Sequence, residues 1–314
     1  MNDLLKIKDI NNFDLSEFPV DHLVIDDFFS DTYLKEVLDN FPEINGNNDL
    51  RGNNNFYLLN DIEKLDIGKC FFWKDFIKKI LPQIVKKLSL KFTKNISPKF
   101  KKLIEDKHKL IYGTLMLSEN AADKTDFCPH YHFDNDPLWF MTFLIYLEDK
   151  NNNAPGTTFY SLNKNISQLD LNVDINRYIG FNNIRQNKKI SYEEQIKVMK
   201  GHLSEFDRKT IEFKPNRLFS FYDDFRSIHS VEYDKNENNH NVKRKTIRVS
   251  IGFDRNLCEN IYQTDINSFS SFFKSNNEKF IRKTFNQELD CLKNKQKTDL
   301  KSQIKNLEVQ DLSF

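Results

Sequence analysis

Apolar residues are spaced as in helices near both ends of the chain, and as in strands through its middle. Residues 22–26 are typical of a short strand, and Ser30 after them is an expected helix N-cap. The helix that it begins has apolar residues at helical spacing, namely Leu34, Val37, Leu38 and Phe41. A second such stripe covers residues 77–88, and Pro82 within it predicts a kink or a break, because proline lacks the backbone N–H. Residues 43–55 are rich in Asn and Gly and are expected to form a loop.

From about residue 109 onward, nearly continuous apolar runs alternate with polar turns. The expected strands are 109–118, 140–148, 157–161, 217–222, 228–233 and 246–253. Short strands of this kind are typical of a β-sandwich or a β-barrel. The polar stretch 162–214 between two of them has mixed helical and loop character. A connection of this length is expected to be an insert that forms a lid or a binding loop.

The change of pattern divides the chain into three regions. Residues 1–108 are expected to form a support of helices and strands, 109–265 the β core, and 266–314 a helical extension. The extension has Phe residues at helical spacing and becomes rich in Lys and Gln beyond residue 292. Those Phe side chains are expected to pack against the core, and a homodimer through the C-terminal helices is the alternative. The predicted fold class is mainly β with flanking helices.

The composition excludes several classes of partner. With 47 Lys and Arg residues against 46 Asp and Glu, the formal net charge is +1, which gives no electrostatic basis for binding nucleic acid or a membrane surface. No window approaches the roughly 20 apolar residues of a membrane span. The four cysteines are scattered, and no secretory signal is visible at the N-terminus, so a reduced protein in the cytoplasm is expected.

The residues best suited to chemistry lie around the expected β core. His132 and Asp134 are two residues apart, so on an extended strand both side chains leave the same face. With His229 from a distant strand, they would give a metal two nitrogens and one carboxylate oxygen and leave its other positions open, as an Fe(II) oxygenase requires. Taken alone, the pair His132 and Asp134 is also typical of a polar turn before a strand. The apolar strand that follows, and the strand that begins near His229, favour the metal site.

Downstream of His229, Arg248 and Ser250 alternate with the apolar residues of the last expected strand. They therefore share the face opposite the apolar one, where Arg248 would provide a fixed cation for an acidic cosubstrate. Arg244 is the second candidate for this cation. It lies in the basic run 243–245, however, and such runs are usually solvated hairpin surface.

These motifs in this order resemble the Fe(II)- and 2-oxoglutarate-dependent dioxygenases, especially the prolyl-4-hydroxylase-like branch of the double-stranded β-helix fold, which has a jelly-roll or cupin-like core. The resemblance is carried by His132-Phe-Asp134, the strand ending in 144–147, the turn 155–158, the apolar run into His229, and Arg248-Val-Ser250. It covers roughly residues 109–254, and 20–41 is also similar. Two features depart from the family. Pro155-Gly156 replaces a Gly-Gly turn, and the insert 234–242 lengthens the gap between His229 and Arg248.

The resemblance implies that His132, Asp134 and His229 hold Fe(II), which would bind 2-oxoglutarate as cosubstrate and then O₂. Halogenases of this family carry a small residue at the position of Asp134. Because a carboxylate stands there in this chain, hydroxylation or a related oxidation is expected instead.

The resemblance also implies how the cosubstrate is held. The distal carboxylate of 2-oxoglutarate would pair with the planar guanidinium of Arg248, with the Ser250 hydroxyl as a further donor. Tyr112 resembles a position from which a tyrosine helps to bind 2-oxoglutarate, although a core aromatic is equally expected there.

Residues near these motifs are candidates for contacting the substrate. His130 faces the same side of a strand as His132, and Arg226 precedes His229 by three residues, where it would hold an anionic group. Trp139 is a further candidate. The simpler alternatives are a loop hydrogen bond for His130, a core position for Trp139 and a turn position for Arg226.

Together these expectations favour a cytoplasmic enzyme that hydroxylates an unactivated C–H bond of a small molecule, such as an amino acid, a sugar or a natural-product intermediate, with release of succinate and CO₂. Desaturation, epimerisation or cyclisation can follow the same chemistry, and a peptidyl, prolyl-type hydroxylase is an alternative. A cupin-like metal-binding protein without oxygenase activity has no need of a buried cation at Arg248. A structural protein with a decayed site is disfavoured because all the expected metal and cosubstrate residues are present.

Overall fold

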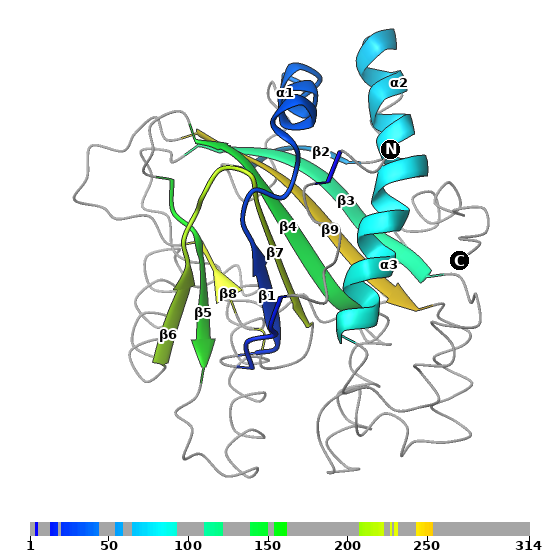
Figure 1. Ribbon diagram of the computed structural model, residues 1–314. Helices are drawn as coiled ribbons and strands as arrows, with labels where there is room; N and C mark the ends of the chain where they lie inside the picture. Colours follow the sequence, from blue (N-terminus) through cyan, green and yellow to red (C-terminus); the bar gives the residue numbers. More distant parts are fainter. Residues whose placement is uncertain are drawn as a thin grey trace, which may run out of the picture.

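The computed structural model describes residues 4–5, 13–17, 20–43, 54–58, 65–92, 110–121, 139–149, 154–161, 207–222, 227, 229–231 and 243–253. They form two β-sheets and a group of helices (Figure 1). The predicted C-terminal extension and most of the predicted insert 162–214 lie outside these residues. None of the described helices is long and apolar enough to cross a membrane.

The larger sheet has six antiparallel strands and contains most of the strands predicted from the apolar runs. Their order across the sheet is β1 (His22–Ile25), β7 (Arg217–Tyr222), β4 (Trp139–Asp149), β9 (Lys243–Phe253), β3 (Leu110–Ala121) and β2 (Asn54–Leu58). The last described strand, β9, therefore lies inside the sheet, with β4 on one side and β3 on the other.

The smaller sheet has the strand order β6 (Asp207–Ile211), β5 (Thr157–Ser161), β8 (His229–Ser230). From β4 onward the chain passes between the sheets: β5 and β6 belong to the smaller one, β7 to the larger, β8 to the smaller and β9 to the larger. Phe159 on β5 contacts Phe219 and Phe221 on β7, with ring centroids 5.5 and 5.2 Å apart, so the two sheets pack face to face. The prediction of a mainly β core with helices beside it is confirmed.

We call the side of the larger sheet that faces the smaller sheet the inner face. It carries Phe219 and Phe221 and the residues in register with them, Leu144 and Thr142 on β4. The outer face is apolar and includes Ile247 and other side chains with no exposed surface, namely Phe143, Ile145, Val249 and Ile251. Because side chains alternate along a strand, each strand divides its residues between these two environments.

The helices lie against the larger sheet (Figure 1). They are α1 (Asp31–Asp39), α2 (Ile67–Asp75), the π-helical turn η3 (Phe76–Ile80) and α3 (Leu81–Phe92). Ser30 caps α1 as predicted, since its Oγ accepts a hydrogen bond from the Tyr33 N–H at 3.3 Å. The disruption predicted from Pro82 takes the form of the π turn, in which the Leu81 N–H donates to the Phe76 carbonyl.

Two strands were not predicted. Residues 54–58 form β2 at one edge of the larger sheet, where the sequence analysis expects the end of an Asn-rich loop. Residues 207–211 form β6 inside the predicted insert, and most of this strand is exposed. Neither segment has a strong apolar alternation, so each is a strand because a neighbouring strand pairs with it and not because of its own residues.

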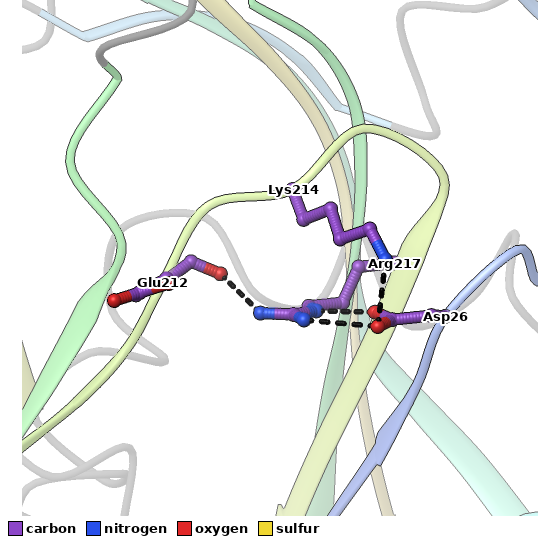
Figure 2. Close-up of polar contacts among 4 residues, drawn as sticks. All are labelled: Asp26, Glu212, Lys214 and Arg217. Atoms are coloured by element: carbon purple, nitrogen blue, oxygen red, sulfur yellow. Dashed lines mark hydrogen bonds and ion pairs between the residues drawn. The ribbon is translucent and has the colours of Figure 1, made fainter.

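A charged cluster joins the end of β1 to the turn between β6 and β7 (Figure 2). Arg217 binds the Asp26 carboxylate with two nitrogens, Nε at 2.6 Å and Nη2 at 3.1 Å, and Lys214 Nζ adds a contact at 2.9 Å. Arg217 Nη1 also donates to the Glu212 carbonyl at 2.8 Å. The hydrogen bond from Arg217 is the main cause that lowers the pKa of Asp26 to about 2. The cluster fixes the edge of the larger sheet against its neighbour.

Candidate functional site

Arg248 and Ser250 lie on the inner face of β9. In the register of β4 and β9, Arg248 is opposite Leu144 and Ser250 is opposite Thr142. Ser250 is buried and Arg248 is half-buried, while Val249 between them is buried on the outer face. The predicted alternation of polar and apolar residues is therefore present in β9, and it directs a cation and a hydroxyl toward the smaller sheet.

Thr142 is a candidate site residue that sequence analysis missed. Its Oγ1 lies 2.9 Å from Ser250 Oγ, and both side chains are buried. Where one hydroxyl donates to the other, the second keeps a proton that it can donate to a ligand. In the sequence Thr142 is one residue of an apolar run, and its register with Ser250 is what gives it a possible role.

His229 lies on β8, at the facing side of the smaller sheet. It is 7% exposed, and its Nδ1 lies 2.7 Å from the Ser227 carbonyl oxygen. A carbonyl only accepts hydrogen bonds, so Nδ1 carries the proton and the neutral ring keeps its lone pair on Nε2. This arrangement is typical of metal-binding histidines, whose second ring nitrogen donates to a carbonyl or a carboxylate. His229 therefore fits the role of one ligand of an Fe(II) site.

Phe221 connects His229 to the inner face. The rings of His229 and Phe221 have centroids 5.1 Å apart, and His229 also contacts Phe159, its partner in the register of β5 and β8, at 5.7 Å. Phe221 is in register with Thr142, which binds Ser250. A potential metal ligand on one sheet and a potential anion-binding pair on the other thus border the same interior.

Four predicted site residues lie outside the described part of the chain, namely His130, His132, Asp134 and Arg226. The metal-ligand and substrate roles predicted for them stay predictions. Within the described residues, no group of three His, Cys, Asp or Glu side chains is close enough to bind a metal. The metal group predicted from the sequence includes His132 and Asp134, which precede β4 (Trp139–Asp149) in the chain.

Tyr112 and Trp139 are placed in strands, but their side chains are not described. The register of β3 and β9 shifts between Tyr112 and Thr114, so that Thr114 lies opposite Ser250 and Tyr112 opposite Ile251. Trp139 begins β4 and lies opposite Gly252. Their proposed contacts with 2-oxoglutarate and substrate stay predictions.

Arg244 differs from its expected environment. The basic run 243–245 predicts a solvated hairpin position for Arg244, but in β9 this residue is 3% exposed. Its Nη1 donates to the Pro155 carbonyl at 2.7 Å, at the turn that leads into β5. The cause is the alternation of β9, which turns Arg244 inward and Lys245 outward, where Lys245 pairs with Glu148 at 3.2 Å and lies over the Phe41 ring.

His22 is a second buried histidine, and sequence analysis assigned it no role. It is 2% exposed on β1, and its Nδ1 donates to the Val20 carbonyl at 2.7 Å. Its ring packs against Phe159 and Phe219, each with centroids 6.3 Å away. Burial lowers the pKa of His22, so its neutral form is favoured in the folded protein.

No family model matches the chain, and no curated protein matches it significantly. Similar solved structures include a prolyl hydroxylase from Trichoplax adhaerens, in complex with a peptide fragment of hypoxia inducible factor. It shares 14% identity over 76% of this chain and 86% of that one, with a TM-score of 0.37. A putative oxygenase from Shewanella oneidensis shares 10% identity over 77% of this chain and 89% of that one, with a TM-score of 0.39. The dioxygenase for auxin oxidation from Arabidopsis thaliana, in complex with 2-oxoglutarate, shares 10% identity over 70% of this chain and 73% of that one, with a TM-score of 0.37.

Proposed function

We propose that the chain is an Fe(II)- and 2-oxoglutarate-dependent oxygenase with a double-stranded β-helix core. The observation that carries this proposal is that His229 on the smaller sheet and the pair Arg248 and Ser250 on the larger sheet border one interior. A metal-binding imidazole and a cation for a dicarboxylate are the two protein groups that such an enzyme has to bring together. The sequence supplies the remaining ligands in His132 and Asp134.

In this proposal His132, Asp134 and His229 hold Fe(II). The bond from His229 Nδ1 to the Ser227 carbonyl fixes the tautomer and the ring orientation before the metal arrives. The Phe159 and Phe221 rings beside His229 keep water from it, which strengthens electrostatic interactions there. When bound, Fe(II) with 2-oxoglutarate supplies the oxidation by O₂ that breaks a substrate C–H bond and releases succinate and CO₂.

Arg248 and Ser250 would bind the distal carboxylate of 2-oxoglutarate. The guanidinium of Arg248 offers two parallel N–H donors that match a carboxylate, and its half-buried position reduces screening by solvent. Ser250 would donate its proton to the same carboxylate while it accepts one from Thr142. The larger sheet thus fixes the cosubstrate, and the smaller sheet contributes a ligand of the metal.

The substrate class we propose is a small molecule, hydroxylated at an unactivated C–H bond by a cytoplasmic enzyme. The support comes from the sequence: the long stretch 162–214 between core strands and the long region before the core favour a dedicated pocket over a flat groove for a peptide. Release of succinate from candidate amino acids, sugars and natural-product intermediates is the measurement that identifies the substrate. A peptide substrate that gives the faster release would contradict this part of the proposal.

The first test is an anaerobic titration with Fe(II) and then 2-oxoglutarate, followed by the visible charge-transfer band of a metal-chelated 2-oxo acid. We expect a band in the wild type and none in Asp134→Ala or His229→Ala. In Arg248→Met, half-saturation should need about 12- to 150-fold more 2-oxoglutarate, because hydrogen bonds to charged groups contribute about 1.5–3 kcal/mol.

Lys245→Met is the matched control, since it removes a positive charge from the same strand but from its outer face. Its half-saturation should equal that of the wild type. Absence of the band in the wild type, together with tight binding of another divalent metal, would contradict the oxygenase proposal and favour a cupin-like metal-binding protein.

A further inference from the structure

We infer that Arg244 is a positioning residue for His229, acting through the turn that begins β5. The inference deepens the proposed function and rests on it in one respect, namely that His229 is a metal ligand. It assigns a role to a buried cation that the proposed binding of Fe(II) and 2-oxoglutarate does not use.

The environment of Arg244 is unusual for an arginine in a basic run. Its side chain is 3% exposed, and Nη1 donates to the Pro155 carbonyl at 2.7 Å. Among the described residues, Nε is buried without a hydrogen-bond partner. A buried guanidinium with an unsatisfied nitrogen contributes little to the stability of the fold. Its hydrogen bond to the Pro155 carbonyl is therefore better explained by the turn that this bond holds in place.

The turn that Arg244 holds is fixed on two further sides. A Cβ on Gly156 would lie 1.9 Å from the Ile211 carbonyl oxygen, so this backbone approaches β6 more closely than any side chain allows. The Thr157 Oγ1 lies 2.7 Å from the hydroxyl of Tyr146 on β4. Pro155 is therefore held by β9, Gly156 lies against β6, and Thr157 is bonded to β4. Together these contacts determine where β5 starts and which way its side chains face.

β5 in turn places His229. Phe159 follows Thr157 by two residues on the same face and is in register with His229, and their ring centroids are 5.7 Å apart. β8 has two residues, and in the described part of the chain β5 is the strand that pairs with it. So short a strand takes its position from its neighbour, and a displaced β5 would therefore displace the imidazole.

The positions of Arg244 and Arg248 on β9 also give the two arginines different roles. Both lie on the inner face of β9, but four residues of strand place their Cα atoms about 13 Å apart. Arg244 is already bonded to the turn before β5, whereas Arg248 is level with Leu144 and Phe219 in the middle of the inner face. One dicarboxylate held by Arg248 would not also need Arg244.

The test compares Arg244→Met with Lys245→Met in the full chain. The chain has seven histidines, so the imidazole NMR signals are few, and His229→Gln identifies the one of interest. In metal-free protein, Arg244→Met should shift the His229 ring signals and speed exchange of its Nδ1 proton. Lys245→Met removes the same charge from the opposite face and should leave both unchanged.

A Mn(II) titration of the same variants adds a functional measurement. Arg244→Met should weaken Mn(II) binding about tenfold, the lower end of the effect expected when a group that orients a metal-binding histidine is removed. Arg244→Lys keeps one donor and should restore part of this loss. Lys245→Met should leave Mn(II) affinity unchanged, because Lys245 lies on the outer face.

The outcomes separate this inference from the proposed function. If the His229 signals do not move in Arg244→Met, the inference is wrong, and a loss of 2-oxoglutarate affinity in that variant would make Arg244 a cosubstrate cation. If the signals move but the wild type binds no metal, the positioning stands and the proposed function fails. If Arg244→Met does not fold, Thr157→Val tests the next step of the same path, and unmoved His229 signals in it would also overturn the inference.

Discussion

At the scale of single residues, the hydrogen bond between Thr142 and Ser250 ties two neighbouring strands together on the inner face. Neither hydroxyl changes the fold class, since an apolar residue of the same size would also fill either position. The bond matters because the hydroxyl that accepts it keeps its own proton for a ligand. A threonine in an apolar strand thus becomes part of the proposed cosubstrate site through its cross-strand partner.

Replacing Thr142 with Val should weaken 2-oxoglutarate binding about 2- to 12-fold, because it removes one hydrogen bond, of about 0.5–1.5 kcal/mol, that orients Ser250. The measurement is a 2-oxoglutarate titration of the metal-loaded protein. Thr158→Val is the control, since it removes a similar bond to Thr210 at 2.9 Å in the smaller sheet. Equal losses in both variants would show that the effect is structural.

How well single residues are predicted from the sequence depends on what decides their environment. The inward direction of Arg248 and Ser250 follows from alternation, which the sequence contains. Thr142 and His22 were missed because their partners, Ser250 and Phe159, are far away in the chain. Arg244 was placed in solvent because a run of basic residues hides the alternation that buries its middle member.

At the scale of elements, the turn before β5 is held against one strand of each sheet, β9 of the larger and β6 of the smaller. Pro155 accepts a hydrogen bond from β9, and Gly156 lies against the backbone of β6. The glycine in this turn is required by space, since its φ is not one that excludes other residues. The departure from a Gly-Gly turn at Pro155 therefore leaves the position with the close backbone contact unchanged.

Gly156→Ala should lower the free energy of unfolding by about 1–3 kcal/mol or more, because the new Cβ would lie 1.9 Å from a backbone oxygen and β6 would have to move. Gly68→Ala on α2 is the matched control. Its Cβ would lie 3.6 Å from Asp66 Oδ1, and alanine should stabilise this helical position by up to about 1 kcal/mol. Chemical denaturation of both variants is the measurement, and losses of similar size would contradict the close contact at Gly156.

The elements that sequence analysis predicts well are those with their own apolar pattern. The strands 157–161 and 217–222 were predicted with the bounds that the structure has, and the bounds of β3, β4 and β9 differ by at most three residues. The strand predicted over 228–233 is described as two residues, His229 and Ser230. β2 and β6 were missed because edge strands have one pairing partner and little need of apolar residues.

At the scale of the whole molecule, a segment near the N-terminus joins the open edges of the two sheets. Ser16 exchanges two backbone hydrogen bonds with His22, on the edge strand β1 of the larger sheet, at 2.8 and 2.9 Å. Its Oγ accepts a hydrogen bond from Lys209 Nζ, on the edge strand β6 of the smaller sheet, at 3.3 Å. Ser16, His22 and Lys209 thus form a seam between the two sheets, and His22 is buried in it.

This seam should weaken in mild acid. Burial is the largest influence on the pKa of His22 and lowers it, and the charge of Lys209 lowers it further. The hydrogen bond to the Val20 carbonyl and the charge of Asp21 raise it, but the net result is a lowered pKa. The unfolded chain therefore takes up the proton first, so the contribution of His22 to stability is complete above its ordinary pKa of about 6.5 and is lost as the pH falls below that value.

The measurement is denaturant unfolding of the wild type and of His22→Asn at pH 7.5 and 5.5. The free energy of unfolding should fall more in the wild type than in the variant over this range. Between pH 7.5 and 9 the difference between the two proteins should stay constant. An equal fall in both proteins below pH 6.5 would mean that other groups cause the acid sensitivity.

The position of β9 inside the larger sheet has a consequence for how the protein is made. β9 pairs with both β3 and β4, and Leu110 at the start of β3 lies opposite Phe253 at its end. A ribosome therefore has to release residue 253 before the sheet is continuous, and until then β3 and β4 each present an unpaired apolar edge. Pairings between such distant residues form slowly, so the growing chain should need a chaperone most during the interval between synthesis of β4 and synthesis of β9.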